Sequence, residues 1–401
     1  MSLSVKQLNA DASFLLTFEA LADASSPYHR PEPFTVLTDP WITGPSKIFH
    51  PILALTNPKT VACISNLRDL PEPDLVIISQ HKSDHCNEAT LRQLPPTGTK
   101  TRILAVPAAA RLIRSWNYFD KSKVLTIPRW DESSSKDTVV RVPVPSVISG
   151  GEPGEVTVTF VQQKRDISGL HAAIGITYRP PTTRRPFPPW SVFTPPATPN
   201  SARFPNPAPY PPTTQALLLA PPTPPSSPRP ARSIRAARST NFHRGISPHP
   251  TPTPGQVPAL SIIFSPHGIS YRSLESYVKN HLIPESALPL TALLHCFDAV
   301  SNPWWLGGNI SSGVPAGQET ALALNTRAWV SAHDGDKDVS GLMTKMLRAR
   351  RYAREEVLEV LAPTGKGSGT RGERGTEVVM LGTGEEIVLC REGLIGGGEK
   401  R

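Results

Sequence analysis

Short apolar runs alternate with amphipathic stretches along most of this 401-residue chain. Runs rich in branched and aromatic side chains indicate strands, and apolar positions three and four apart indicate helices. Strands are predicted at residues 14–18, 34–39, 75–79, 102–106, 123–127, 156–161, 172–178, 260–264, 292–295 and 328–331. Helices are predicted at residues 88–93, 108–115, 273–280, 317–325 and 339–361. This alternation predicts a layered α/β sandwich.

The composition changes abruptly at residues 179–258, which hold 24 of the 46 prolines and nine arginines but no lysine, aspartate or glutamate. Such a segment buries too little apolar surface to offset its ordering entropy, so we predict a disordered insertion. It divides the α/β domain into a first part, 1–178, and a second part, 259–362. A glycine-rich tail follows at 363–401, and two apolar runs around a glycine-containing turn at 377–389 predict a β-hairpin there.

The net charge of +9 comes wholly from that insertion, because the remaining 33 basic and 33 acidic residues cancel. Nucleic acid is therefore not an expected partner. Proline-rich segments fit SH3 and WW grooves, so one interpretation of the insertion is an arm that binds partner proteins. The other is a surface insertion without a partner, since long loops cost little extra closure entropy.

The stretch that points most clearly to chemistry is Ser79-Gln80-His81-Lys82-Ser83-Asp84-His85-Cys86, directly after the strand predicted at 75–79. It places His81, Asp84 and His85 on a strand-to-helix turn. Imidazole and carboxylate groups are ligands of divalent metals, and a sharply bent turn lets the adjacent Asp84 and His85 reach one ion. The sequence therefore predicts a metal site at an edge of the sheet.

This stretch resembles the His-x-His-x-Asp-His signature of the metallo-β-lactamase superfamily. Upstream, residues 34–41 resemble the strand and aspartate that precede the signature in its lactonase-like and phospholipase D-like branch. Downstream, residues 328–334 resemble the last strand of the family, which ends at the metal-site histidine, here His333. The resemblance covers residues 5–362 with one large insertion. It implies an αββα four-layer sandwich with the metal site at one edge, where the sheets meet.

Departures from the signature predict one metal ion rather than two. Gln80 and Lys82 stand where the first two histidines belong, and Arg165, with Asp166 nearby, stands where a later histidine is expected. Ammonium and guanidinium groups have no lone pair to offer a metal. In the remaining site, His267 of a Ser-Pro-His-Gly turn takes the place of a bridging aspartate. The predicted ligand set is His81, Asp84, His85, His267 and His333, with His81 as an accessory group. Zinc is the expected ion, with manganese and iron as alternatives.

Two functions stay open. In the first, a metal-bound hydroxide attacks a small-molecule ester, lactone or phosphodiester, with Asp84 orienting the water and His81 shuttling a proton. In the second, four ligands close the site, and the protein is an inactive scaffold whose proline-rich and arginine-rich arm binds partners. Trp304 and Trp305 are either an apolar wall of the substrate pocket or core residues.

The cysteines and the amino terminus bear on the compartment. The four cysteines form no Cys-x-x-Cys pair, which favours reduced thiols. The first residues lack the apolar core of a signal peptide, and no stretch reaches the roughly 20 apolar residues of a membrane span. The expectation is a soluble cytoplasmic protein, and a nuclear location stays open.

Overall fold

The computed structural model describes residues 1–20, 32–48, 54–146, 150–166, 168–181, 257–341, 344–362 and 375–395. Residues 1–185 and 248–401 form one compact unit, which contains the helices and strands of the described residues. Most of the proline-rich insertion predicted at 179–258 lies outside the described residues, so its disorder stays a prediction.

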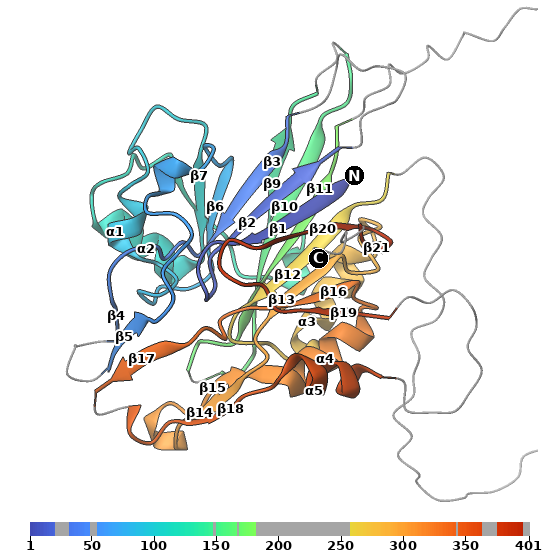
Figure 1. The fold of residues 1–401 in the computed structure, drawn as a ribbon. Helices are drawn as coiled ribbons and strands as arrows, with labels where there is room; N and C mark the ends of the chain where they lie inside the picture. The colour runs from blue at the N-terminus through green and yellow to red at the C-terminus, as the bar shows by residue number, and fades with distance from the viewer. Residues whose placement is uncertain are drawn as a thin grey trace, which may run out of the picture. The chain divides into compact units, whose positions relative to one another are not determined.

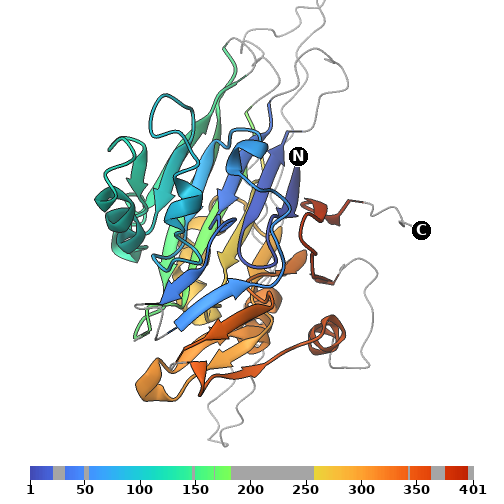
Figure 2. The same ribbon diagram turned by 60° about the vertical axis from the view of Figure 1, so that its left-hand side comes forward.

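Two large sheets form the centre of this unit (Figures 1 and 2). The first sheet has the order β21 (Gly393–Leu394), β20 (Glu386–Cys390), β1 (Ser2–Gln7), β2 (Phe14–Glu19), β3 (Phe34–Thr38), β6 (Leu75–Ile78), β7 (Arg102–Ala105) and β8 (Val124–Thr126). The second has the order β19 (Glu377–Val379), β16 (Ala328–Ser331), β13 (Ala292–His295), β12 (Leu260–Ser265), β11 (Ala172–Arg179), β10 (Gly154–Gln162) and β9 (Val139–Val144).

Apolar side chains join the two sheets face to face. Phe14 of β2 meets Phe264 of β12 edge to face, with ring centroids 6.4 Å apart. Phe18 of β2 stacks on Tyr178 of β11 at 4.8 Å. In β1 every second side chain is buried, as expected of a strand with one face on the core. This shared core fixes the two sheets against each other, and so fixes the turns at their edges.

Helices cover the outer face of each sheet. The helices α1 (Glu88–Leu91) and α2 (Pro107–Ser115) lie beside the first sheet, and α3 (Tyr271–Tyr277), α4 (Gly313–Ala323) and α5 (Arg354–Leu361) beside the second (Figure 1). The single turns are η1 (Leu67–Asp69), η2 (Glu132–Ser134), η4 (Trp304–Leu306) and the π-helix η3 (Val278–Leu282). The predicted αββα four-layer sandwich is confirmed.

Two small sheets lie at the end of the sandwich where the metal site was predicted. One has the order β15 (Asn309–Ser312), β14 (Ala299–Ser301) and β18 (Arg348–Arg350), and the other has β17 (Lys337–Ser340), β5 (Ala54–Pro58) and β4 (Ser46–Ile48). None of these six strands was predicted, because they are short and pair outside the main core.

The single helix predicted at 339–361 is wrong. The segment contains the end of β17, then β18, and only α5 is helical. Val339, Met346 and Leu347 follow a helical spacing, yet each is exposed. Gly341 has a φ of 119°, which ends the strand β17 in a turn. Pairing of β17 with β5 and of β18 with β14 supplies the backbone hydrogen bonds that a helix would otherwise make.

The β-hairpin predicted at 377–389 is also wrong. Both apolar runs are strands, but β19 pairs in parallel with β16 of the second sheet. The next strand, β20, pairs antiparallel with β1 of the first sheet. The tail therefore crosses from one sheet to the other, and each run extends an edge that would otherwise be open.

Candidate metal centre

Three histidines from distant parts of the chain meet where the two sheets end. His85 lies on the turn after β6, His267 on the turn after β12, and His333 on the turn after β16. The strands β12, β13 and β16 are parallel neighbours, as are β3 and β6, so their carboxyl ends share an edge. Loops at the carboxyl ends of parallel strands are the usual place for binding groups in such sheets.

The spacing of the three imidazoles suits one metal ion. One ligand nitrogen from each of His85, His267 and His333 lies within 4.8 Å of the others. The Nε2 atoms of His85 and His267 are 3.2 Å apart. Two nitrogens bound tetrahedrally to zinc at its usual bond length lie about 3.3 Å apart. Within the described parts of the chain, this is the one group of three such side chains close enough to hold an ion.

The other ring nitrogen of His85 is held by a buried carboxylate. His85 Nδ1 lies 2.7 Å from Asp39 Oδ2, and Asp39 also accepts a hydrogen bond from the backbone N–H of Ser79 at 2.7 Å. Asp39 has a φ of 39°, a strained conformation that these contacts hold in place. Burial opposes protonation of His85, but Asp84 and Asp39 outweigh it and raise the pKa of His85. Asp39 therefore fixes the ring so that Nε2 faces the centre.

The other two histidines are oriented in the same way. His267 Nδ1 lies 3.0 Å from the carbonyl oxygen of Ile310, which only accepts, so His267 carries its proton on Nδ1. His333 Nδ1 lies 2.8 Å from Asp11 Oδ1. Burial lowers the pKa of His333 and holds that of His267 well below its ordinary value. Neutral rings with a protonated Nδ1 leave Nε2 with a lone pair for a metal.

Asp84 supplies a candidate oxygen ligand. Its Oδ2 lies 3.9 Å from His85 Nε2, and its buried Oδ1 has no hydrogen-bond partner among the residues that the structure describes. Burial alone raises the pKa of Asp84, but His85, His333 and Lys337 outweigh it and lower that pKa. A buried, charged carboxylate oxygen without a partner fits a metal ligand, because leaving it unsatisfied is costly.

His81 is not part of this group. Its side chain is exposed, and it is absent from the set of nitrogens that converge. Partial burial of the ring and the charge of Lys82 nevertheless lower its pKa. Its predicted role as an accessory ligand or proton shuttle stays a prediction.

Residues at two positions of the first metal site that the resemblance implies make contacts with the protein itself. Gln80 Nε2 donates to the carbonyl oxygen of Leu170 at 3.1 Å. Asp166 accepts from the backbone N–H groups of Ser168 and His171, at 3.0 and 2.7 Å, and so closes its own loop. That a first metal site is missing stays a prediction.

Sequence reasoning missed Asp11 and Lys337. Asp11 is buried in the turn between β1 and β2, and its Oδ1 lies 2.8 Å from both His333 Nδ1 and Lys337 Nζ. Lys337 Nζ is also 3.2 Å from His333 Nδ1. Burial opposes ionisation of Asp11, but His333 and Lys337 outweigh it and hold its pKa far below the ordinary range. The one signal in the sequence for this turn was the alternation of apolar residues along β1, the strand before it.

Neighbouring candidates have other roles. Asp334 accepts hydrogen bonds from the backbone N–H groups of Phe297 and Asp298, at 2.7 and 2.9 Å. Burial raises the pKa of Asp334 to about 7. Cys86 is buried, which raises the pKa of its thiol and leaves it unreactive. All four cysteines are free. Trp304 and Trp305 are 87% and 59% exposed, so neither is a core residue.

Comparison with known families supports this architecture. Residues 24–172, which include Asp39, Asp84 and His85, match the sequence model of the β-lactamase superfamily domain. This match covers most of the first part of the α/β domain and agrees with the resemblance to the metallo-β-lactamase superfamily. A search of curated proteins gave no match. Within the described ranges, no helix is both long and apolar enough to cross a membrane.

The solved structures to which the chain is similar are distant in sequence. The chain is similar to Igni18, a metallo hydrolase from the archaeon Ignicoccus hospitalis, with 10% identity and a TM-score of 0.41 over 97% of this chain and 98% of that one. It is similar to CmlA, a diiron β-hydroxylase from Streptomyces venezuelae, with 11% identity and a TM-score of 0.40 over 83% and 45%. It is also similar to the metallo-β-lactamase fold protein YhfI from Bacillus subtilis, with 11% identity and a TM-score of 0.39 over 96% and 99%.

Proposed function

We propose that this protein is a metal-dependent hydrolase that cleaves an ester, lactone or phosphodiester with one metal ion held by His85, His267 and His333. The observation that carries the proposal is the pair of Nε2 atoms only 3.2 Å apart, on rings whose Nδ1 atoms face Asp39 and a carbonyl oxygen. If both rings are neutral, they direct lone pairs at each other, which is unfavourable unless a proton or a metal ion lies between them.

Different side chains would have different roles in such a reaction. A divalent ion held here supplies Lewis acidity, which activates water and polarises the bond to be broken. Asp39 and Asp11 keep the rings of His85 and His333 in the required tautomer. Asp84 Oδ1 has no other partner among the described residues, so it is free to bind the ion or to take the proton of the attacking water.

Lys337 supports the choice of one ion. Its ammonium lies 2.8 Å from Asp11 and 3.2 Å from His333 Nδ1, where it already balances the charge of that carboxylate. A second divalent ion beside His333 would meet this positive charge and would lack the ligands replaced by Gln80 and Lys82. Zinc suits three nitrogens and one oxygen, and manganese or iron would use the same ligands.

The test is metal content, measured by elemental mass spectrometry on the native chain and on His85→Ala, His333→Ala and His81→Ala. We expect about one ion per native chain, its loss in the first two variants, and its retention in His81→Ala. Circular dichroism checks that each variant is folded. Hydrolysis of ester, lactone and phosphodiester substrates by the metal-loaded native chain then tests the activity.

Two results would contradict the proposal. Two ions per chain would exclude the single-ion site. A protein that binds no metal after reconstitution and hydrolyses none of these substrates would instead support the scaffold interpretation, in which the arginine-rich and proline-rich segment recruits partner proteins.

A further inference from the structure

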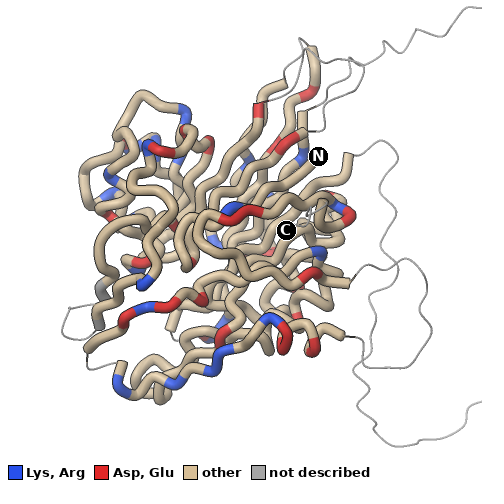
Figure 3. The backbone as a smooth tube through the Cα atoms, viewed as in Figure 1, with Lys and Arg blue, Asp and Glu red and all other residues tan. Residues whose placement is uncertain are grey.

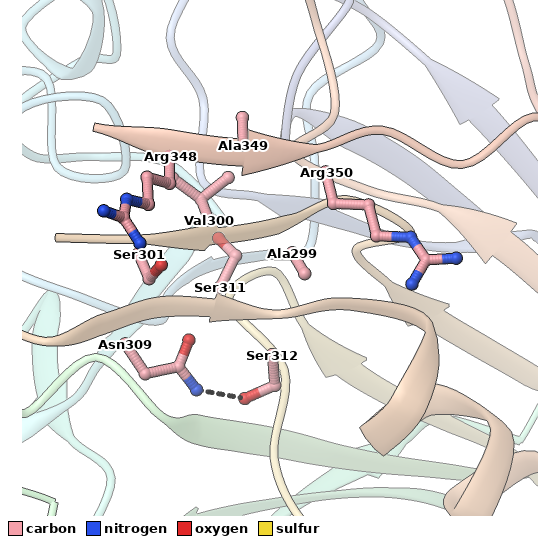
Figure 4. Close-up of a pocket in the computed structure, with 9 residues that line it drawn as sticks. All are labelled: Ala299, Val300, Ser301, Asn309, Ser311, Ser312, Arg348, Ala349 and Arg350. Atoms are coloured by element: carbon pink, nitrogen blue, oxygen red, sulfur yellow. Dashed lines mark hydrogen bonds between the residues drawn. The ribbon is translucent and has the colours of Figure 1, made fainter. Parts of the chain in front are cut away.

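A second site lies on the small sheet beside the metal centre. The sheet of β14, β15 and β18 carries an open pocket of about 350 Å³ (Figure 4). The polar residues that line it are Ser301, Asn309, Ser311, Ser312, Arg348 and Arg350. No residue that we assign to the metal centre lines this pocket, so the ligand that it binds has to be inferred from its own residues.

The pocket is positively charged. Arg348 and Arg350 occupy alternate positions of β18, so their side chains leave the same face of the strand about 7 Å apart. Among the residues that the structure describes, no carboxylate forms an ion pair with either one, whereas the neighbouring Arg351 pairs with Asp336 at 2.7 Å. In Figure 3 several basic segments, in blue, recur along the lower edge of the view, where Figure 1 labels β18. Two unpaired guanidinium groups on one pocket favour an anionic ligand.

The number and spread of donors suit a phosphate group. In Figure 4 the guanidinium of Arg348 lies beside Ser301 at one end of the pocket, and that of Arg350 lies at the other end. The ring of Tyr352 holds Arg350, whose Cζ lies 4.5 Å from the ring centroid. Hydroxyl and amide groups lie between the two ends. A phosphate group offers three terminal oxygens and up to two negative charges, so it can use more of these separated donors than a carboxylate with two oxygens and one charge.

One strand joins this pocket to the metal centre. In β15, Ser311 and Ser312 line the pocket, while the carbonyl oxygen of Ile310 holds His267 Nδ1 at 3.0 Å. The Ser312 N–H donates to the carbonyl oxygen of His267 at 2.9 Å, and Ser311 Oγ lies 3.5 Å from its Nδ1. A molecule anchored in the pocket therefore contacts the same strand that holds the His267 ring.

We propose that this pocket binds the phosphate group of a phosphate ester substrate between Arg348 and Arg350. This inference rests on the proposed function for the role of the substrate, but not for phosphate binding itself. The exposed Trp304 and Trp305 lie on the loop between β14 and β15 and offer an apolar surface next to the pocket. The phosphate ester is therefore either a free metabolite or the headgroup of a lipid.

Phosphate binding is measured on the full chain after removal of metal with a chelator, so that a metal ion cannot contribute. The probe is inorganic phosphate in isothermal titration calorimetry. We expect the Arg348→Ala/Arg350→Ala double variant to lose at least tenfold in affinity. The control Arg351→Ala, which removes one positive charge next to the pocket but outside its lining, should stay within twofold. The Arg348→Lys/Arg350→Lys variant keeps the charge and should lose affinity to an intermediate extent.

Equal affinity of the native chain and the Ala double variant would overturn the proposal, as would an equal loss in Arg351→Ala. Vesicles of phosphatidylcholine with and without phosphatidic acid distinguish the two sources. Binding to the acidic vesicles that is lost in both the Arg double variant and Trp304→Ala/Trp305→Ala supports a lipid headgroup. Phosphate binding without vesicle binding supports a free phosphate ester. Because metal is absent, failure of the metal proposal would not change these results.

Discussion

Replacement of Asp39 by Asn tests the orientation of His85 most directly. Asp39 is fully buried and meets His85 Nδ1 at 2.7 Å. An amide that keeps its oxygen on the Ser79 N–H presents its NH₂ group to His85 Nδ1, so the ring proton must move to Nε2. Nε2 is the nitrogen that faces His267, 3.2 Å away. Asp39→Asn therefore blocks the lone pair that would bind the metal, without changing the shape of the side chain.

Loss of such an orienting partner costs about 10-fold to 100-fold in metal affinity, which is about 1.4–2.8 kcal/mol. The charge-assisted hydrogen bonds of Asp39 also stabilise the metal-free fold, by about 1.5–3 kcal/mol. The assay is competition with a chromophoric chelator for metal affinity, together with urea unfolding of the metal-free protein. Both quantities are expected to fall in Asp39→Asn.

A matched control separates the two effects. Asp74→Asn changes a carboxylate that accepts the Thr35 N–H at 2.8 Å between the same strands, β3 and β6, but away from the histidines. It should lower the stability and leave the metal affinity within twofold. Metal affinity in Asp39→Asn within threefold of the native value would refute the argument that Asp39 sets the tautomer of His85.

Three further changes are expected to have measurable effects. Lys337→Met leaves Asp11 without its cation, so urea unfolding should show a loss of about 3 kcal/mol, while chelator competition should show at least threefold tighter metal binding. Burial lowers the pKa of His281 to about 4. Protonation of this residue should therefore lower the free energy of unfolding by on the order of 2–3 kcal/mol as the pH falls from 7 to 4. The free energy of unfolding of His281→Gln should fall by less over the same range. Gly317→Ala places a methyl group against the Trp329 ring, where there is no room for it, so thermal unfolding should show a loss of about 1–3 kcal/mol although alanine favours helices.

The sequence was sufficient for the long, buried strands of the sandwich. Each predicted strand coincides with an observed one, because continuous apolar runs such as Leu260–Ser265 have no other stable environment. Prediction failed where pairing rather than composition decides the structure. Arg348–Arg350 is wholly exposed and has no strand pattern, so only its pairing with β14 makes it a strand.

The sequence predicted those residues of the candidate site that belong to local motifs. Asp84 and His85 follow an apolar strand, and His267 and His333 each follow another, so a strand-end pattern finds all four. Asp11 is different, because nothing in its turn points to a histidine at the far end of the chain. It meets His333 at 2.8 Å only because both sheets pack on one core. Contacts across the two sheets are a property of packing, and sequence patterns within one strand do not contain them.

The protonation state of the histidines distinguishes a metal site from a simple hydrogen bond between His85 and His267. A proton on His85 Nε2 would satisfy His267 Nε2, which lies 3.2 Å away, and the raised pKa of His85 favours it. That proton would leave Asp84 Oδ1 buried without a partner among the described residues. It would also leave the ring of His333, whose centroid lies 4.4 Å from that of His267, without a role. A divalent ion engages all three imidazoles and the carboxylate together. Because buried polar groups without partners are costly, the full set of donors argues for a metal ion rather than a proton.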